Sequence, residues 1–229
     1  VLFLILEKLG YKWAKNCFHL SYGMVNLPTG KMKSREGTVV DADDFLNEMF
    51  NSAKDLSNEL GKLDGFNKKQ KNDLYEIVSL GAVKYYMLKV DPKKEMLFNP
   101  DESIDFNGNT GPFIQYTHAR ICSLKRRSPD TKIECTPNSI LQDKEKELLK
   151  VLLCYPEVIQ ESARTYNPAV IAHYVYDLVK AYNQFYQQVP IFSADNNKDV
   201  GFRVGLSGMV GKVIASSMNL LGISVPERM

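Results

Sequence analysis

Apolar side chains recur every three or four residues along most of this chain, a spacing that places them on one face of an α-helix. The clearest run follows Asp41, a residue type that caps helices, and ends at Gly61, a residue type that stops them. A lysine-rich linker at 62–71 precedes a second run over 74–88. From there on the pattern predicts helices only, at 112–127, about 140–154, 156–165, 168–188 (with Asn167 as its cap) and 198–221.

Two short segments near the start favour strands instead. They are 16–20 and 37–40, and they flank a loop rich in glycine, proline, lysine and serine. The opening apolar run ends at Gly10 and is typical of the end of a helix. Because the chain opens within such a pattern and without methionine, we expect further protein upstream of it.

Residues 91–111 are polar and rich in turn-forming pairs, although they include Phe98, Ile104 and Phe106. This composition indicates an ordered connector, and we place a domain boundary near 105. The sequence thus divides into 1–60, 61–105 and 106–229, the last of which is predicted to be a bundle of helices.

Composition excludes few kinds of binding site. The 229 residues include 29 basic and 27 acidic side chains, a net charge of +2, so any affinity for nucleic acid depends on how charge is distributed. The four cysteines form no CxxC pair, and the three histidines lack ligand-like spacing, so we expect no metal site. The apolar start, 1–6, is too short to span a bilayer, and we expect a cytoplasmic protein.

The segment 29–37 concentrates three cations, Lys31, Lys33 and Arg35, among small residues. Such a loop suits a polyphosphate ligand, although composition alone favours a solvated basic loop. It is not a Walker A loop, because that motif places Ser or Thr after its lysine and here Met32 follows Lys31.

Four stretches occur together in one order. They are Ser-Tyr-Gly-Met-Val followed by Lys-Met-Lys-Ser-Arg-Glu-Gly-Thr-Val-Val, Gly-Ala-Val-Lys-Tyr at 81–85, Gly-Asn-Thr-Gly-Pro-Phe-Ile-Gln-Tyr-Thr-His-Ala-Arg-Ile at 108–121, and Leu-Leu-Gly-Ile-Ser-Val-Pro-Glu-Arg-Met at the end. In this combination the chain resembles the class I arginyl-tRNA synthetases over essentially its whole length.

The resemblance implies that 31–35 is the KMSKS loop, which closes over ATP and stabilises charge on its phosphates. Lys31 and Met32 keep the first two letters, whereas Lys33, Ser34 and Arg35 depart from the last three. We therefore expect Lys31 and Lys33 to serve catalysis, and 31–35 to contact ATP together with the backbone of Met24 and Val25. The family's HIGH motif belongs upstream, so the chain alone is expected neither to catalyse the reaction nor to hold ATP and Mg²⁺.

The same resemblance implies anticodon contacts from the helical bundle. Tyr182 and Tyr186 lie one helical turn apart, and Gln115, Tyr116 and Met229 fall at other positions near tRNA. Two alternatives stay open. Tyr182 also continues an apolar stripe and can be core, and the cations at 125–127 can bind phosphate or stabilise a helix end.

The predicted fold is thus mainly α: the end of a class I Rossmann-type catalytic domain at 1–60, stem-contacting helices and a connector at 61–105, and an anticodon-binding bundle at 106–229. The implied function of the parent enzyme is to join arginine to arginine tRNA with ATP. We expect a monomer without membrane association. The alternative is a non-catalytic helical module that binds RNA or a protein.

Overall fold

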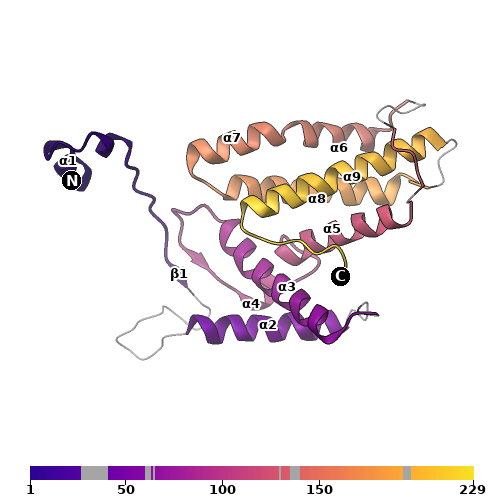
Figure 1. Cartoon of the computed structure of the whole chain (residues 1–229), viewed down its shortest axis with the longest axis horizontal. Helices are drawn as coiled ribbons and strands as arrows, with labels where there is room; N and C mark the ends of the chain where they lie inside the picture. Colours follow the sequence, from indigo (N-terminus) through magenta and orange to yellow (C-terminus); the bar gives the residue numbers. More distant parts are fainter. Residues whose placement is uncertain (27–40, 60–62, 64, 129, 135–139, 193–196) are drawn as a thin grey trace.

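The computed structural model describes residues 1–229 except 27–40, 60–62, 64, 129, 135–139 and 193–196. Most described residues are helical (Figure 1). The elements are α1 (Leu2–Lys8), the 3₁₀ helix η1 (Lys12–Asn16), β1 (Val25–Asn26), α2 (Ala42–Glu59), α3 (Lys68–Leu88), β2 (Met96–Leu97), α4 (Pro100–Ile104), α5 (Gly111–Arg126), α6 (Asp143–Leu153), α7 (Tyr155–Thr165), α8 (Ala169–Gln188) and α9 (Asn197–Leu220).

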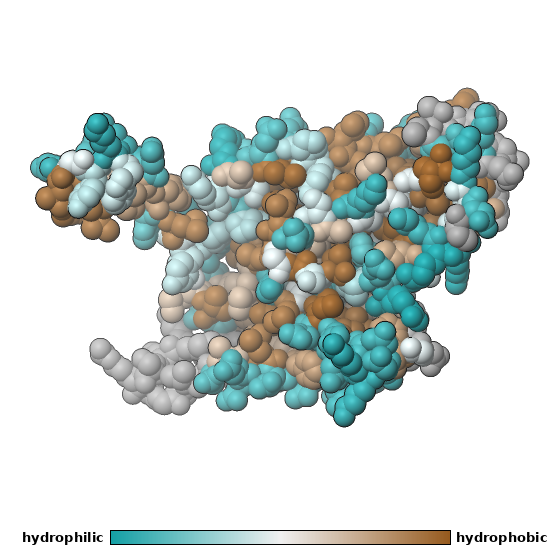
Figure 2. Space-filling view, in the orientation of Figure 1, coloured by the Kyte–Doolittle hydropathy of each residue, from teal (hydrophilic) through white to brown (hydrophobic). Residues whose placement is uncertain are grey.

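The first 24 residues form an arm that projects from the rest of the molecule (Figure 1). Its short helix α1 ends before Gly10, whose φ of +91° suits glycine. The strand predicted at 16–20 is not formed: Asn16 ends η1, and 17–20 have no regular structure. The arm exposes a broad apolar surface (Figure 2), and it contacts the bundle where the Phe18 ring stacks on Tyr166, with centroids 4.4 Å apart.

Two strands of two residues each pair in parallel, with Val25 opposite Met96. The prediction of helices only from the run at 74–88 onward is therefore wrong at β2, because two residues are too few to display the alternation of a strand. The other predicted strand, 37–40, lies outside the described residues. Gly23 allows the close approach here, since a Cβ on it would lie 2.1 Å from the Lys94 carbonyl oxygen.

Helices α2, α3 and α4 share one hydrophobic core. Asp41 caps α2 by accepting a hydrogen bond from the backbone of Asp43, and Asn67 caps α3 through a capping box with Gln70. The fully buried side chains between these helices include Met49, Ala53, Val78, Ala82 and Phe98.

Helices α5 to α9 form the bundle predicted from the apolar pattern, around a second core. Tyr85 of α3 belongs to this core, so α3 packs against both groups of helices. The α3–α5 contact is close, because a Cβ on Gly111 would lie 2.2 Å from the carbonyl oxygen of Gly81. The predicted start of α8 is one residue early, yet Asn167 does accept a hydrogen bond from the Ala169 backbone.

Candidate nucleic-acid interface

The cationic loop predicted to contact ATP lies outside the part of the chain that the structure describes. Lys31, Met32, Lys33, Ser34 and Arg35 all fall within 27–40, outside the described residues. The two predicted contacts before the loop are described. The Met24 carbonyl accepts a hydrogen bond from the Met96 backbone at 3.0 Å, and Val25 pairs with Met96, so the parallel pair fixes the backbone just ahead of the loop.

A pocket of about 340 Å³ opens beside α5, the end of α8 and the C-terminal residues. We call it the arginine-aromatic pocket. It is lined by Phe66, Tyr116, Ala119, Arg120, Ser123, Leu124, Arg126, Arg127, Tyr186, Phe192, Arg228 and Met229. The structure thus brings together three of the predicted contact residues, Tyr116, Tyr186 and Met229, from three separate parts of the chain.

Arg120 contacts two of the aromatic rings that line this pocket. Its guanidinium is 5.0 Å from the centre of the Tyr116 ring and 5.5 Å from that of Tyr186, distances typical of cation–π contacts. Its Nη1 donates a hydrogen bond to Asn183 Oδ1 at 3.0 Å, which fixes the plane of the group. Arg120 was not among the residues predicted from the sequence, although it lies one helical turn after Tyr116, where a neighbour on the helix surface is expected.

Further aromatic rings and cations form part of the remaining wall. Phe192, half exposed, and Tyr186, 37% exposed, come from the end of α8 and the chain after it. The Arg228 guanidinium lies 4.8 Å from the Phe66 ring centre. Phe66 and Arg228 lie far apart in the sequence, so no sequence pattern indicated their contact.

The C-terminal segment, residues 221–229, reaches the pocket because side chains of α3 and α5 hold its backbone. Lys84 donates to the carbonyl of Gly222 at 2.7 Å, and Arg126 donates to that of Glu227 at 3.2 Å. His118 Nδ1 lies 2.9 Å from the Pro226 carbonyl oxygen, so this nitrogen carries the proton. Met229 is accordingly half-buried beside the core of α2, α3 and α4.

Gln115 is part of this same anchorage, and its predicted contact with tRNA is corrected. The side chain is fully buried, and its Nε2 donates to the carbonyls of Ile77 at 2.9 Å and Ser224 at 2.8 Å. A buried amide already bonded to two backbone segments leaves no surface for a nucleotide. Gln115 joins α3, α5 and the C-terminal segment.

Tyr182 also lies away from the pocket surface. Its ring is fully buried in the bundle core, between the apolar residues of the stripe to which it belongs. Burial raises the pKa of its hydroxyl to about 12. The core alternative therefore holds for Tyr182, while Tyr186, one turn further on, is at the surface.

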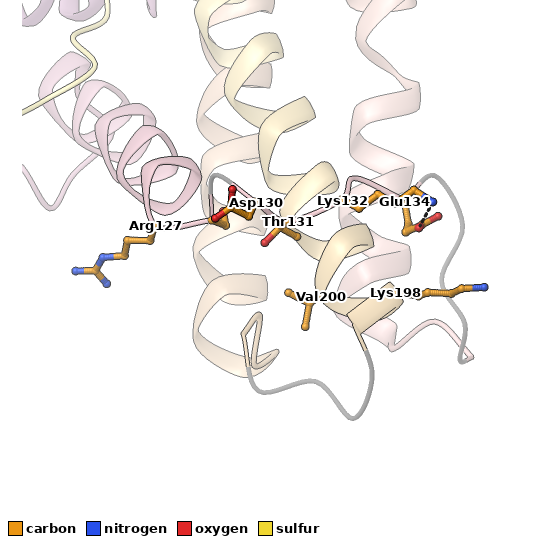
Figure 3. A pocket seen from close by; sticks show the side chains of 8 residues that line it. Arg127, Asp130, Thr131, Lys132, Glu134, Lys198 and Val200 are labelled. Atoms are coloured by element: carbon orange, nitrogen blue, oxygen red, sulfur yellow. Dashed lines mark ion pairs between the residues drawn. The ribbon is translucent and has the colours of Figure 1, made fainter.

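A larger cavity of about 480 Å³ lies where the chain between α5 and α6 crosses the start of α9 (Figure 3). Its charged residues have both signs, since Asp130 and Glu134 line it with three cations. Lys132 is paired with Glu134 at 3.4 Å, and the side chains of Arg127 and Lys198 extend in opposite directions. Cations that diverge cannot converge on one anion, so this cavity is a poorer candidate than the arginine-aromatic pocket.

Two family models match the chain. Residues 1–99 match the catalytic domain of class I tRNA synthetases of the arginine type, and 114–229 match the DALR anticodon binding domain. The first match counts against the alternative of a non-catalytic module.

Comparison with known proteins points to the same family. The arginine–tRNA ligase of Flavobacterium psychrophilum is 58% identical over the whole chain, and that of Bacteroides thetaiotaomicron is 53% identical. The chain spans only 38% and 39% of the lengths of these relatives. The solved arginyl-tRNA synthetase of Thermus thermophilus superposes over 100% of the chain and 38% of its own, with a TM-score of 0.87 and 30% identity. The chain therefore belongs to the class I arginyl-tRNA synthetase family, and it joins the end of a catalytic domain to a DALR anticodon-binding domain.

Proposed function

We propose that the arginine-aromatic pocket binds unpaired bases in the anticodon loop of an arginine tRNA. The observation that carries this proposal is the position of Arg120 between the rings of Tyr116 and Tyr186. Bases that leave the stack of a loop expose their faces to aromatic rings and to guanidinium planes, and their edges to hydrogen-bond donors. A planar guanidinium flanked by two rings offers both kinds of contact.

The charge of the pocket supports an RNA ligand. Among the described residues that line it, four are arginines and none is acidic, whereas the whole chain carries only +2. Clustered arginines next to rings stabilise the phosphates on either side of a stacked base. We therefore expect affinity to fall steeply with salt, and preference for a base to depend on the rings and on Arg120.

For the whole protein, we propose the activity of an arginine–tRNA ligase, the joining of arginine to its tRNA, as its relatives are named. We propose that ATP is the source of energy. Lys31 and Lys33 would stabilise the charge on the phosphates, and Mg²⁺ would arrive with ATP. None of the described helices is long and apolar enough to cross a membrane. We further propose that the protein is a monomer and acts in the cytoplasm, where its tRNA substrate is found.

Lys31→Ala and Lys33→Ala test the loop in a full-length protein that carries this sequence. Each should slow arginine-dependent exchange of ATP and pyrophosphate, since one lost charge-stabilising donor costs about 3 kcal/mol in the transition state. Affinity for tRNA should stay nearly unchanged. The loop assignment is wrong if neither substitution slows exchange by about tenfold.

The pocket is tested by Arg120→Lys in the 229-residue chain. Lysine keeps the charge but loses the plane that lies between the rings, so binding of a hairpin with the arginine anticodon loop should weaken by about tenfold. Arg164→Lys is the matched control, because Arg164 lies exposed on α7 and pairs only locally, with Glu161. Fluorescence anisotropy gives both dissociation constants. Equal weakening by the two variants, or none by either, contradicts the proposal.

A further inference from the structure

A buried ion pair lies inside the bundle, away from solvent and from the pocket surface. The Nε of Arg203 in α9 is 2.7 Å from Oε1 of Glu145 in α6, and the two side chains are 7% and 3% exposed. Stability alone does not account for such a pair, because removing both charges from water is costly and apolar side chains of equal volume often serve as well.

The pair makes two further bonds, one within the cap of α6 and one to a separate segment. Arg203 Nη1 donates to the carbonyl oxygen of Pro190 at 2.9 Å, and Glu145 Oε2 accepts from the backbone of Gln142 at 2.7 Å. One guanidinium thus links α9, the first turn of α6 and the chain that leaves α8. Apolar replacements could fill the same space, but they could not hold the Pro190 carbonyl.

Pro190 lies in the short stretch of chain that runs from the end of α8 to the arginine-aromatic pocket. Helix α8 ends at Gln188, Ile191 is buried in the bundle core, and Phe192 then forms part of the pocket wall beside Tyr186. Pro190, held by Arg203, and the buried Ile191 are therefore the two residues that lead the chain into the pocket wall at Phe192.

We propose that Arg203 is a positioning residue: held by Glu145, it fixes the Pro190 carbonyl and so keeps the Phe192 ring in place before RNA arrives. This inference rests on the function proposed for the pocket. A wall ordered in advance avoids the cost of ordering a side chain on binding. Loss of the pair should therefore weaken recognition while the fold persists.

Two measurements on the 229-residue chain test the proposal with the double variant Glu145→Met/Arg203→Met, which removes both charges of the pair together. The first uses no RNA. In a Trp13→Phe/Phe192→Trp background the introduced indole is the single tryptophan, because the chain has one tryptophan of its own. We expect acrylamide to quench its emission more strongly in the double variant, with the melting temperature nearly unchanged.

The second measurement compares dissociation constants for a hairpin with the arginine anticodon loop, without the tryptophan changes. The double variant should bind about two- to tenfold more weakly, the cost of ordering one side chain. The exposed pair of α7 supplies the control, Glu161→Met/Arg164→Met, which should change neither readout.

If the double variant does not fold, Arg203→Lys replaces it: this keeps the charge beside Glu145 but lacks the second donor arm, and it should give the same two changes. Unchanged quenching in a folded variant overturns the inference, whatever RNA does. Failure of the unsubstituted chain to bind the hairpin overturns the function of the pocket instead, and the quenching result then still decides whether Arg203 positions Phe192.

Discussion

Tyr182 and Tyr186 lie one turn apart on α8, with ring centres 6.1 Å apart, yet only one faces solvent. Tyr186→Ala removes a stacking surface worth roughly 1 to 3 kcal/mol per base, so hairpin binding should weaken by about tenfold while the melting temperature holds. Tyr186→Phe keeps the ring and should bind nearly as the unsubstituted chain does. Unaltered binding by Tyr186→Ala would remove this ring from the interface.

Tyr182→Ala should instead lower the stability of the fold. Loss of a fully buried aromatic ring costs about 3 to 5 kcal/mol of unfolding free energy, so the melting temperature should fall markedly. Thermal unfolding followed by circular dichroism, beside Tyr186→Ala, makes the comparison. A melting temperature as high as that of Tyr186→Ala would contradict the core assignment.

The buried hydroxyl of Tyr182 also predicts a dependence on pH. Its pKa in the folded chain, about 12, lies above the ordinary value of 10, so the unfolded chain loses this proton first. The stabilisation is complete below pH 10 and is lost as pH rises toward 12, by up to about 2 to 3 kcal/mol. Urea unfolding at pH 8 and 11 should show a smaller alkaline loss for Tyr182→Phe. Equal losses would show that this hydroxyl does not titrate as described.

At the scale of elements, α3 and α5 approach so closely that glycine is required. A Cβ on Gly111 would lie 2.2 Å from a backbone oxygen of α3, so Gly111→Ala should force the helices apart and cost about 1 to 3 kcal/mol. Gly208 on α9 is the matched control. Its nearest neighbour would be Lys125 Cδ at 4.0 Å, so Gly208→Ala should stabilise α9 by up to about 1 kcal/mol. Two equal changes in unfolding free energy would contradict this account.

The sequence predicted the helices well, because their apolar stripes and caps are local. Asp41 and Asn167 both accept backbone hydrogen bonds at the starts predicted for them. It did not predict β2, whose two residues pair with a strand some 70 positions earlier. The sequence did not indicate that Gln115 is buried, because only the tertiary structure brings Ser224 within reach of its amide.

For the molecule as a whole, the arginine-aromatic pocket forms only when both groups of helices and the C-terminal segment are assembled. Phe66 precedes α3, Arg120 lies on α5 and Met229 ends the chain, so residues separated by more than 160 positions share one wall. Tyr116, Tyr186 and Met229 were predicted individually from a family resemblance. Their convergence, and the arginines among them, required the fold.

Photocrosslinking tests the central claim most directly. A 5-iodopyrimidine in the anticodon loop of the hairpin reacts on irradiation with aromatic rings stacked on it, and mass spectrometry of the digested complex identifies the labelled peptide. The account predicts label on Tyr116, Tyr186 or Phe192, and its loss with excess unmodified hairpin. Label confined to the projecting arm or to residues 130–134, with none on these three rings, would contradict it.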